Sequence, residues 1–197
     1  MEKLSTRKTL TILLSGRAGV GKTLASQLLV EYLTGRYEKV KVGVFPFAMK
    51  LKSTARACGW DGEKDEKGRR LLQRLGQVLR EYDKDTWVRA TFDGAIENNL
   101  KYPLDVVIID DWRFPNEYDF ILTRPLYQPI KVKILSPDRE ILKGTPAYSE
   151  ESETSLPILS DYYDYVINNV WDLNVYKSQI ENLWNSILET NKEIIRQ

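Results

Sequence analysis

The feature that most constrains this chain is one eight-residue run, Gly16-Arg17-Ala18-Gly19-Val20-Gly21-Lys22-Thr23. It has the pattern G-x-x-x-x-G-K-[ST], which is typical of a loop that binds phosphate. Glycine lacks the Cβ atom that disfavours positive φ, so the backbone can turn tightly and gather its N–H groups around an anion. We expect Lys22 to reach the β- and γ-phosphates of ATP and the Thr23 hydroxyl to hold Mg²⁺. Residues Gly16 to Leu24 are therefore the predicted ATP-binding segment.

The segments on both sides of this loop agree with that interpretation. Leu10 to Ser15 is a short apolar run, which predicts a buried strand. After the loop, apolar residues recur at helical spacing, at Leu24, Ala25, Leu28, Leu29 and Tyr32. A helix N-terminus at the loop favours phosphate, because the helix dipole is positive there. The alternative, a glycine-rich turn without a ligand, stays open at this point.

Composition limits what else the chain can do. The 197 residues predict one domain, spanning 1–197, with a substantial core. The 29 lysines and arginines nearly balance the 28 aspartates and glutamates, so no overall field attracts a nucleic acid polymer or an anionic membrane. The lack of histidine excludes histidine bases, histidine-activated nucleophiles and histidine-bound metals. Since neither a signal peptide nor a membrane-length apolar run is present, we expect a cytoplasmic protein, with the lone Cys58 as a small core residue.

The rest of the chain alternates between predicted strands and predicted helices. Strands are expected at residues 38–45, 106–109, 129–135 and 164–168, and helices at 47–58, 68–82, 86–100, 116–123 and from 175 onward. This alternation predicts a three-layer α/β fold with a parallel sheet, whose ligands bind at the carboxyl ends of the strands. Residues 47–100 are too many for an ordinary crossover, so we expect a helical acceptor-binding insertion there. The polar segment 136–156, with Arg139 and Lys143, is either a mobile lid-like excursion or a plain surface loop.

The predicted helix 68–82 has two faces with different chemistry. Its apolar stripe consists of Leu71, Leu72, Leu75, Val78, Leu79 and Tyr82. A second face carries Arg69, Gln73, Gln77 and Arg80, which lie at helical spacing. That second face is either an ordinary solvent-exposed surface or a polar wall that faces a substrate phosphate. Thr86 is expected to cap the next helix.

Two aspartates, Asp110 and Asp111, directly follow the apolar run 106–109, which predicts a buried central strand. A carboxylate at this position is well placed for Mg²⁺. Adjacent residues of a strand point to opposite faces, so at most one of the two should face the metal. Asn116 is expected to cap the helix that follows, with Glu117 favoured in its first turn.

With these pieces in place, the chain resembles the deoxynucleoside monophosphate kinase family of phages and bacteria over most of its length. The most specific match is Asp111-Trp112-Arg113-Phe114-Pro115-Asn116-Glu117, which is similar to the family signature D-x-R-F-x-N-E. Residues 72–76 with Arg80 and Trp87 resemble its L-Q-x-L-G segment, and Phe47-Ala48 with Lys50 and Lys52 resembles its segment after the second strand. Further matches are Ser152-Glu153-Thr154 and Val166-Ile167-Asn168, whereas Glu150 stands where the family often has histidine.

The resemblance implies a P-loop kinase fold with five parallel strands in the order 2-3-1-4-5, and transfer of the ATP γ-phosphoryl group to a deoxynucleoside monophosphate. ATP and Mg²⁺ are the implied cofactors, the implied partner is a small-molecule nucleotide, and a homodimer is left open. The residues expected to bind the acceptor are Phe47, Lys50, Arg69, Gln73, Arg80, Trp87 and Arg113. The catalytic candidates are Lys22, Arg80, Arg113, Arg139 and Asp111, and the metal candidates are Thr23, Asp110 and Asp111.

Two other functions stay open at the level of the sequence. One is a P-loop kinase that phosphorylates another small metabolite, and the other is a nucleotide-binding or nucleotide-sensing protein without catalysis. Each candidate arginine also has a rival role in a structural ion pair. A GTPase is disfavoured because Asn191-Lys192-Glu193-Ile194 lacks the final aspartate of the guanine-reading motif N-K-x-D.

Overall fold

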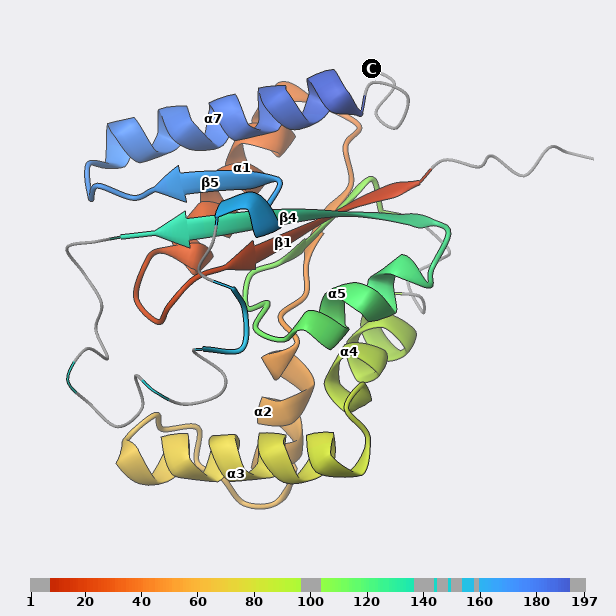
Figure 1. The fold of residues 1–197 in the computed structure, drawn as a ribbon, viewed down its shortest axis with the longest axis vertical. Helices are drawn as coiled ribbons and strands as arrows, with labels where there is room; N and C mark the ends of the chain where they lie inside the picture. The colour runs from red at the N-terminus through yellow and green to blue at the C-terminus, as the bar shows by residue number, and fades with distance from the viewer. Residues whose placement is uncertain are drawn as a thin grey trace, which may run out of the picture.

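The computed structural model describes residues 8–96, 104–136, 144, 149, 154–157 and 160–191. Within them, five strands form one parallel sheet: β1 (Thr9–Ser15), β2 (Val42–Val44), β3 (Val106–Ile109), β4 (Tyr127–Leu135) and β5 (Tyr165–Asn168). Their order across the sheet is β2-β3-β1-β4-β5 (Figure 1). The predicted α/β fold and strand order are therefore confirmed.

Helices cover both faces of the sheet, as a three-layer fold requires. One face carries α1 (Lys22–Arg36) and α7 (Leu173–Thr190), and the other carries α4 (Thr86–Thr91), the π-helix η1 (Phe92–Ile96) and α5 (Pro115–Leu122). The helices α2 (Ala48–Ala57) and α3 (Glu66–Tyr82) extend away from the sheet on the side of α4 (Figure 1). The 3₁₀ turn η4 (Ser160–Tyr162) precedes β5. None of the helices in the described part of the chain is both long and apolar enough to cross a membrane.

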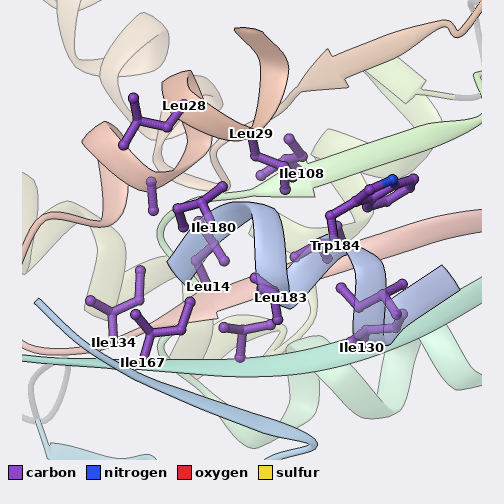
Figure 2. Packing of buried hydrophobic residues seen from close by; sticks show 14 of the residues in the cluster. Leu14, Leu28, Leu29, Ile108, Ile130, Ile134, Ile167, Ile180, Leu183 and Trp184 are labelled. Atoms are coloured by element: carbon purple, nitrogen blue, oxygen red, sulfur yellow. The ribbon is translucent and has the colours of Figure 1, made fainter. Parts of the chain in front are cut away.

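The larger core lies between the sheet and the pair α1 and α7. Figure 2 shows Leu14, Ile134 and Ile167 of the sheet packed against Ile180 and Leu183 of α7. The stripe predicted for the terminal helix is buried, as expected, at Ile180, Leu183, Trp184 and Ile187. This core holds α1 and the loop before it against the carboxyl end of the sheet.

The second core lies on the other face of the sheet and contains more aromatic residues. Leu13 and Ile109 of the sheet pack there with Trp112, Phe92 and Phe47. Trp112 lies among the rings of Tyr118, Tyr162 and Tyr163, with ring centroids about 6 Å apart. This core joins the sheet to α4, α5 and the start of α2, and so positions the predicted acceptor side.

Two predictions about side chains in the helices are wrong. The apolar stripe of α3 is only partly covered, since Val78 is 58% exposed and Tyr82 is 90% exposed. The reason is that α3 packs on α2 and α4 rather than on the sheet, so these helices cover only part of its apolar arc. Cys58 is exposed at the end of α2 rather than buried in the core.

Several element boundaries also differ from the predictions. The second strand is shorter than 38–45, and the predicted helix 86–100 is α-helical only to Thr91 before the π-helix begins. Asp85, not Thr86, is the N-cap of α4, and the Thr86 hydroxyl instead donates to the Leu79 carbonyl. Phe114, not Asn116, is the N-cap of α5.

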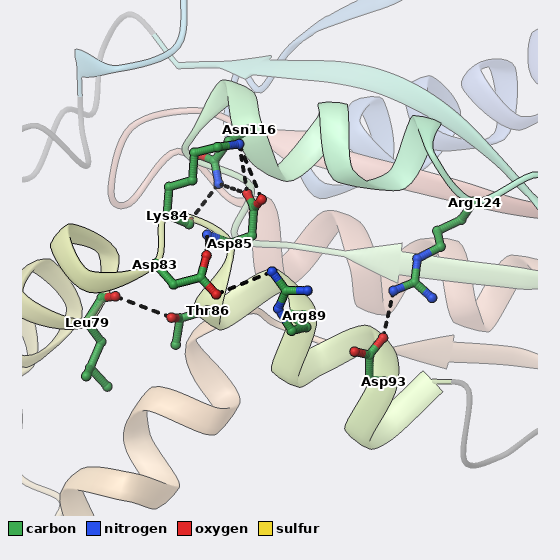
Figure 3. Close-up of polar contacts among 9 residues, drawn as sticks. All are labelled: Leu79, Asp83, Lys84, Asp85, Thr86, Arg89, Asp93, Asn116 and Arg124. Atoms are coloured by element: carbon green, nitrogen blue, oxygen red, sulfur yellow. Dashed lines mark hydrogen bonds and ion pairs between the residues drawn. The ribbon is translucent and has the colours of Figure 1, made fainter.

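Asn116 has a different role from the predicted cap. Its side-chain amide donates to the Lys84 carbonyl at 2.8 Å and to the Asp85 carboxylate at 2.9 Å (Figure 3). Just after α5, Arg124 forms an ion pair with Asp93 of η1. The contacts of Asn116 therefore fix α5 to the turn between α3 and α4, and the ion pair fixes the end of α5 to η1.

Candidate active site

The glycine-rich loop lies at the carboxyl edge of the sheet, between the end of β1 and the start of α1. Gly16, Gly19 and Gly21 have φ values of 151°, 84° and 102°, which disfavour any residue with a side chain. A Cβ atom on Gly16 would lie 2.4 Å from the Ile134 carbonyl oxygen, so the space there is closed to one. The loop thus has the conformation of a backbone cradle next to a helix N-terminus, which suits a phosphate group.

Lys22 begins α1, and its side chain bends back over this loop. Its ammonium group donates to the Gly16 carbonyl at 2.6 Å and to the Arg17 carbonyl at 2.9 Å. The side chain is 8% exposed, so the charge is held close to the cradle. A positive charge in this position adds to the attraction of the backbone N–H groups for a phosphate.

The structure distinguishes the two aspartates at the end of β3. The Thr23 hydroxyl donates to the Asp110 carboxylate at 3.0 Å, so these two oxygen ligands meet beside the loop. Hydroxyl and carboxylate oxygens are ligands that Mg²⁺ accepts, so this donor pair fits the metal expected with a nucleoside triphosphate. Of the two aspartates, Asp110 is therefore the one that faces the glycine-rich loop.

Asp111 points to the opposite face of β3, as the alternation of a strand requires. Its carboxylate accepts the backbone N–H groups of Phe47 at 2.7 Å and Ala48 at 2.9 Å, which lie at the start of α2. Burial raises the pKa of Asp111, and these two N–H donors and the Arg113 guanidinium act against that rise, whereas Asp110 adds to it. Asp111 therefore holds the start of α2 to the sheet and does not face Thr23.

The turn that follows Asp111 contains one candidate arginine, Arg113, and is contacted by another, Arg80. The Arg80 guanidinium of α3 lies 4.3 Å from the centre of the Phe114 ring, within the range of a cation–π contact. The indole of Trp112 donates to the Phe114 carbonyl at 2.9 Å, which fixes the backbone of Phe114. Arg113, half-buried, is the residue just before Phe114. Arg80 of α3 thus contacts the turn that contains Arg113.

Glu117 is a residue of this turn to which the sequence assigned no part in the site. Its carboxylate accepts the backbone N–H groups of Arg113 at 3.0 Å and Phe114 at 3.1 Å. The side chain is 7% exposed, and burial, with a contribution from Asp111, raises its pKa to about 8, although the two N–H donors and Arg80 oppose the rise. The signal was present in the sequence, since a glutamate at the third position of a helix commonly accepts from the N-cap backbone.

The other predicted acceptor residues lie on α2, α3 and α4. Phe47 and Trp87 are buried, and the Trp87 indole donates to the Gly76 carbonyl of α3 at 3.1 Å. Lys50 and Gln73 are exposed. Arg69 donates through Nε to the Lys64 carbonyl at 2.9 Å.

Lys64, in the segment between α2 and α3, lies near two other cations, Lys52 and Arg69. The pKa of Lys64 is lowered, mainly by the nearby charge of Lys52, then by burial and by Arg69. Acidic residues share this segment, at Asp61, Glu63, Asp65 and Glu66. Arg139, the remaining catalytic candidate, lies outside the described residues, as does most of the segment 136–156.

Comparisons with known proteins place the fold among solved structures. The sequence matches no protein-family model and no curated protein. The structure is similar to that of the APS kinase of Mycobacterium tuberculosis in complex with AMPPNP and APS, at 12% identity over 90% of this chain and 96% of that chain, with a TM-score of 0.49. It is also similar to a protein from Chloroflexus aurantiacus, at 15% identity over 91% of this chain and 98% of that chain, with a TM-score of 0.45. Because these sequence identities and TM-scores are low, the functional argument rests on the geometry of the site.

Proposed function

We propose that this chain is an ATP-dependent kinase that transfers the γ-phosphoryl group to the phosphate of a nucleoside monophosphate, with deoxynucleoside monophosphates as the preferred acceptors. The observation that carries the proposal is the meeting of Thr23 and Asp110 at 3.0 Å beside a glycine cradle closed by Lys22. A cradle, an ammonium group and an oxygen donor pair are the parts that phosphoryl transfer from a nucleoside triphosphate requires.

On the ATP side, the loop 16–23 binds the β- and γ-phosphates through its backbone N–H groups, and Lys22 neutralises part of their charge. Thr23 and Asp110 are the residues that would hold Mg²⁺, which when bound neutralises charge on the phosphate oxygens. For Lys22 to reach the γ-phosphate, its ammonium must turn from the loop carbonyls toward the incoming oxygen atoms.

On the acceptor side, Arg80 and Arg113 bind the phosphate of the monophosphate. A guanidinium matches two phosphate oxygens with a pair of parallel hydrogen bonds, which sets the orientation of the acceptor. The ring of Phe114 lies 4.3 Å from the Arg80 guanidinium and supports it from one face.

The reaction itself needs positioning more than covalent help from the protein. An oxygen of the acceptor phosphate attacks the γ-phosphorus and forms the new P–O bond. The bond between the γ-phosphorus and the bridging oxygen breaks, and ADP leaves with the electron pair. The acceptor oxygen is already an anion near neutral pH, so no side chain has to remove a proton, and the lack of histidine is compatible with the chemistry.

The test is ADP release from ATP and Mg²⁺ over a panel of nucleoside and deoxynucleoside monophosphates, together with other small anionic and hydroxyl-bearing metabolites. Turnover with one or more deoxynucleoside monophosphates, absent in Lys22→Ala, supports the proposal. Turnover with another metabolite alone would show that the proposed acceptor is wrong, but would support the proposed kinase activity. Binding of ATP without turnover of any panel member refutes the catalytic proposal and favours a nucleotide-sensing protein.

A further inference from the structure

The turn between β5 and α7 contacts the phosphate-binding loop from the edge of the sheet. Asn169, the first residue after β5, is 2% exposed, and its backbone N–H donates to the Leu135 carbonyl at 2.8 Å. Its side-chain Nδ2 donates to the Val20 carbonyl of the loop at 3.0 Å. A Cβ atom on Gly21 would lie 2.5 Å from this Nδ2, so the amide of Asn169 lies directly on the loop backbone.

The orientation of the Asn169 amide is determined by its two partners. The Trp171 backbone N–H can only donate and faces Oδ1 at 3.0 Å, whereas the Val20 carbonyl can only accept and faces Nδ2. Trp171 has a φ of 62°, which is unfavourable for a residue with a large side chain. Its indole donates to the Ser136 hydroxyl at 2.6 Å, which helps to hold this conformation. Strain of this kind persists where the surroundings enforce it, often beside a binding site.

Tyr176 of α7 makes a second contact with the same loop. Its hydroxyl donates to the Gly21 carbonyl at 3.2 Å, and its side chain is 1% exposed. The carbonyls of Val20 and Gly21 are therefore both held from the side of β5 and α7. These carbonyls belong to two successive peptide units of the loop.

Because of peptide geometry, these two contacts determine the direction of the N–H groups in the phosphate-binding loop. In a trans peptide unit the carbonyl and the following N–H point in opposite directions. When Asn169 holds the Val20 carbonyl outward, the Gly21 N–H is directed to the inner side of the loop. When Tyr176 holds the Gly21 carbonyl, the Lys22 N–H is directed inward in the same way. N–H groups that converge in this manner form an anion site.

We propose that Asn169, assisted by Tyr176, is a positioning residue that orients two N–H groups of the phosphate-binding loop toward the triphosphate. The proposal rests on the proposed function only in that the loop binds the phosphates of ATP. It predicts that the loss of these contacts weakens the binding of any polyphosphate, with or without a nucleoside, rather than the binding of the base.

The test compares two ligands on four proteins: wild type, Asn169→Ala, Tyr176→Phe and the control Asn168→Ala, which changes an exposed asparagine one residue earlier. Titration calorimetry measures Kd for ATP and for tripolyphosphate, each with Mg²⁺, and thermal melting reports the fold separately. Asn169→Ala should weaken both ligands by the same factor of about ten, because one carbonyl loses its partner. Tyr176→Phe should have a smaller effect on both, since the Gly21 carbonyl still accepts the Ala25 N–H at 2.9 Å.

The outcomes separate this inference from the proposed function. A lower melting temperature with unchanged Kd for both ligands would mean that Asn169 is only structural, and a loss for ATP alone would assign it to the nucleoside. Either result overturns the inference about Asn169 and does not affect the proposed kinase function. If the wild type binds neither ligand, the phosphate site itself fails, and both proposals fall with it. Tyr176→Phe keeps the test decisive if Asn169→Ala does not fold.

Discussion

The surroundings of Glu117 predict how much the unfolding free energy changes with pH. The carboxyl is buried, accepts two backbone N–H groups and has its pKa raised from 4.5 to about 8 in the fold. In the folded protein it is therefore mostly neutral near pH 7, whereas in the unfolded chain it is ionised. The perturbation is Glu117→Gln, which keeps the shape and one acceptor oxygen but cannot ionise.

The magnitude comes from linkage between protonation and folding. Because the folded-state pKa is raised, the stability that Glu117 contributes is full below pH 4.5 and is lost as the pH rises through about 8. At about 1.36 kcal/mol for each pH unit, the whole interval corresponds to about 5 kcal/mol, of which about 3.5 kcal/mol is lost between about pH 5 and about pH 8. The glutamine variant has no such loss, so its stability relative to wild type should rise by about this amount over that range.

The assay is urea denaturation of both proteins at the two pH values, followed by circular dichroism. Glu189→Gln, a change of the same kind at an exposed position of α7, is the control for removing one charge. A difference in unfolding free energy between Glu117→Gln and wild type that stays constant from about pH 5 to about pH 8 would refute the reasoning. It would mean that the Glu117 carboxyl is solvated or paired well enough to ionise in the fold.

Three further predictions concern the proposed reaction. Lys22→Ala should lower kcat at least about a hundredfold with the circular dichroism spectrum unchanged, because in the proposed reaction the ammonium turns toward the developing charge; near-normal ADP release would exclude it from the site. Arg80→Ala should raise KM for the acceptor at least about tenfold with KM for ATP unchanged, and an equal rise in both would remove Arg80 from the acceptor side. Asp110→Asn should raise the Mg²⁺ concentration needed for half-maximal rate. Asp111→Asn should instead lower the unfolding free energy by about 1–3 kcal/mol. If the two variants showed the opposite effects, Asp111 would be the metal ligand and Asp110 the structural residue.

Much of the fold followed from local patterns that tertiary contacts did not override. The apolar run of β3 and the helical stripe of α7 are buried as predicted, because each pattern matches the period of its element. The glycine-rich loop could be placed between β1 and α1 from its flanks alone. The strand order, in contrast, came only from the family resemblance, since periodicity along the chain does not state which strands are neighbours.

The partners of individual polar side chains could not be predicted in the same way. Asn116 has the side chain of a typical helix cap, yet it reaches across to the turn before α4, and the helix begins at Pro115 instead. Similarly, the covered face of α3 depends on where α2 and α4 pass, which no pattern within α3 specifies. Such features depend on the packing of segments that are distant in sequence, so they became visible only in the assembled fold.

The two carboxylates at the end of β3 show how one strand can serve both halves of the proposed site. Asp110 meets Thr23 on the side of α1, and Asp111 meets the start of α2 on the side of the acceptor lobe. Both assignments depend on the register that sets Ile109 beside Leu13 of β1. A slip of one residue would exchange the faces, placing the metal candidate in the aromatic core and removing the anchor of α2. The buried pairing of β1 with β3 therefore fixes the positions of both the proposed metal ligand and the lobe proposed to present the acceptor.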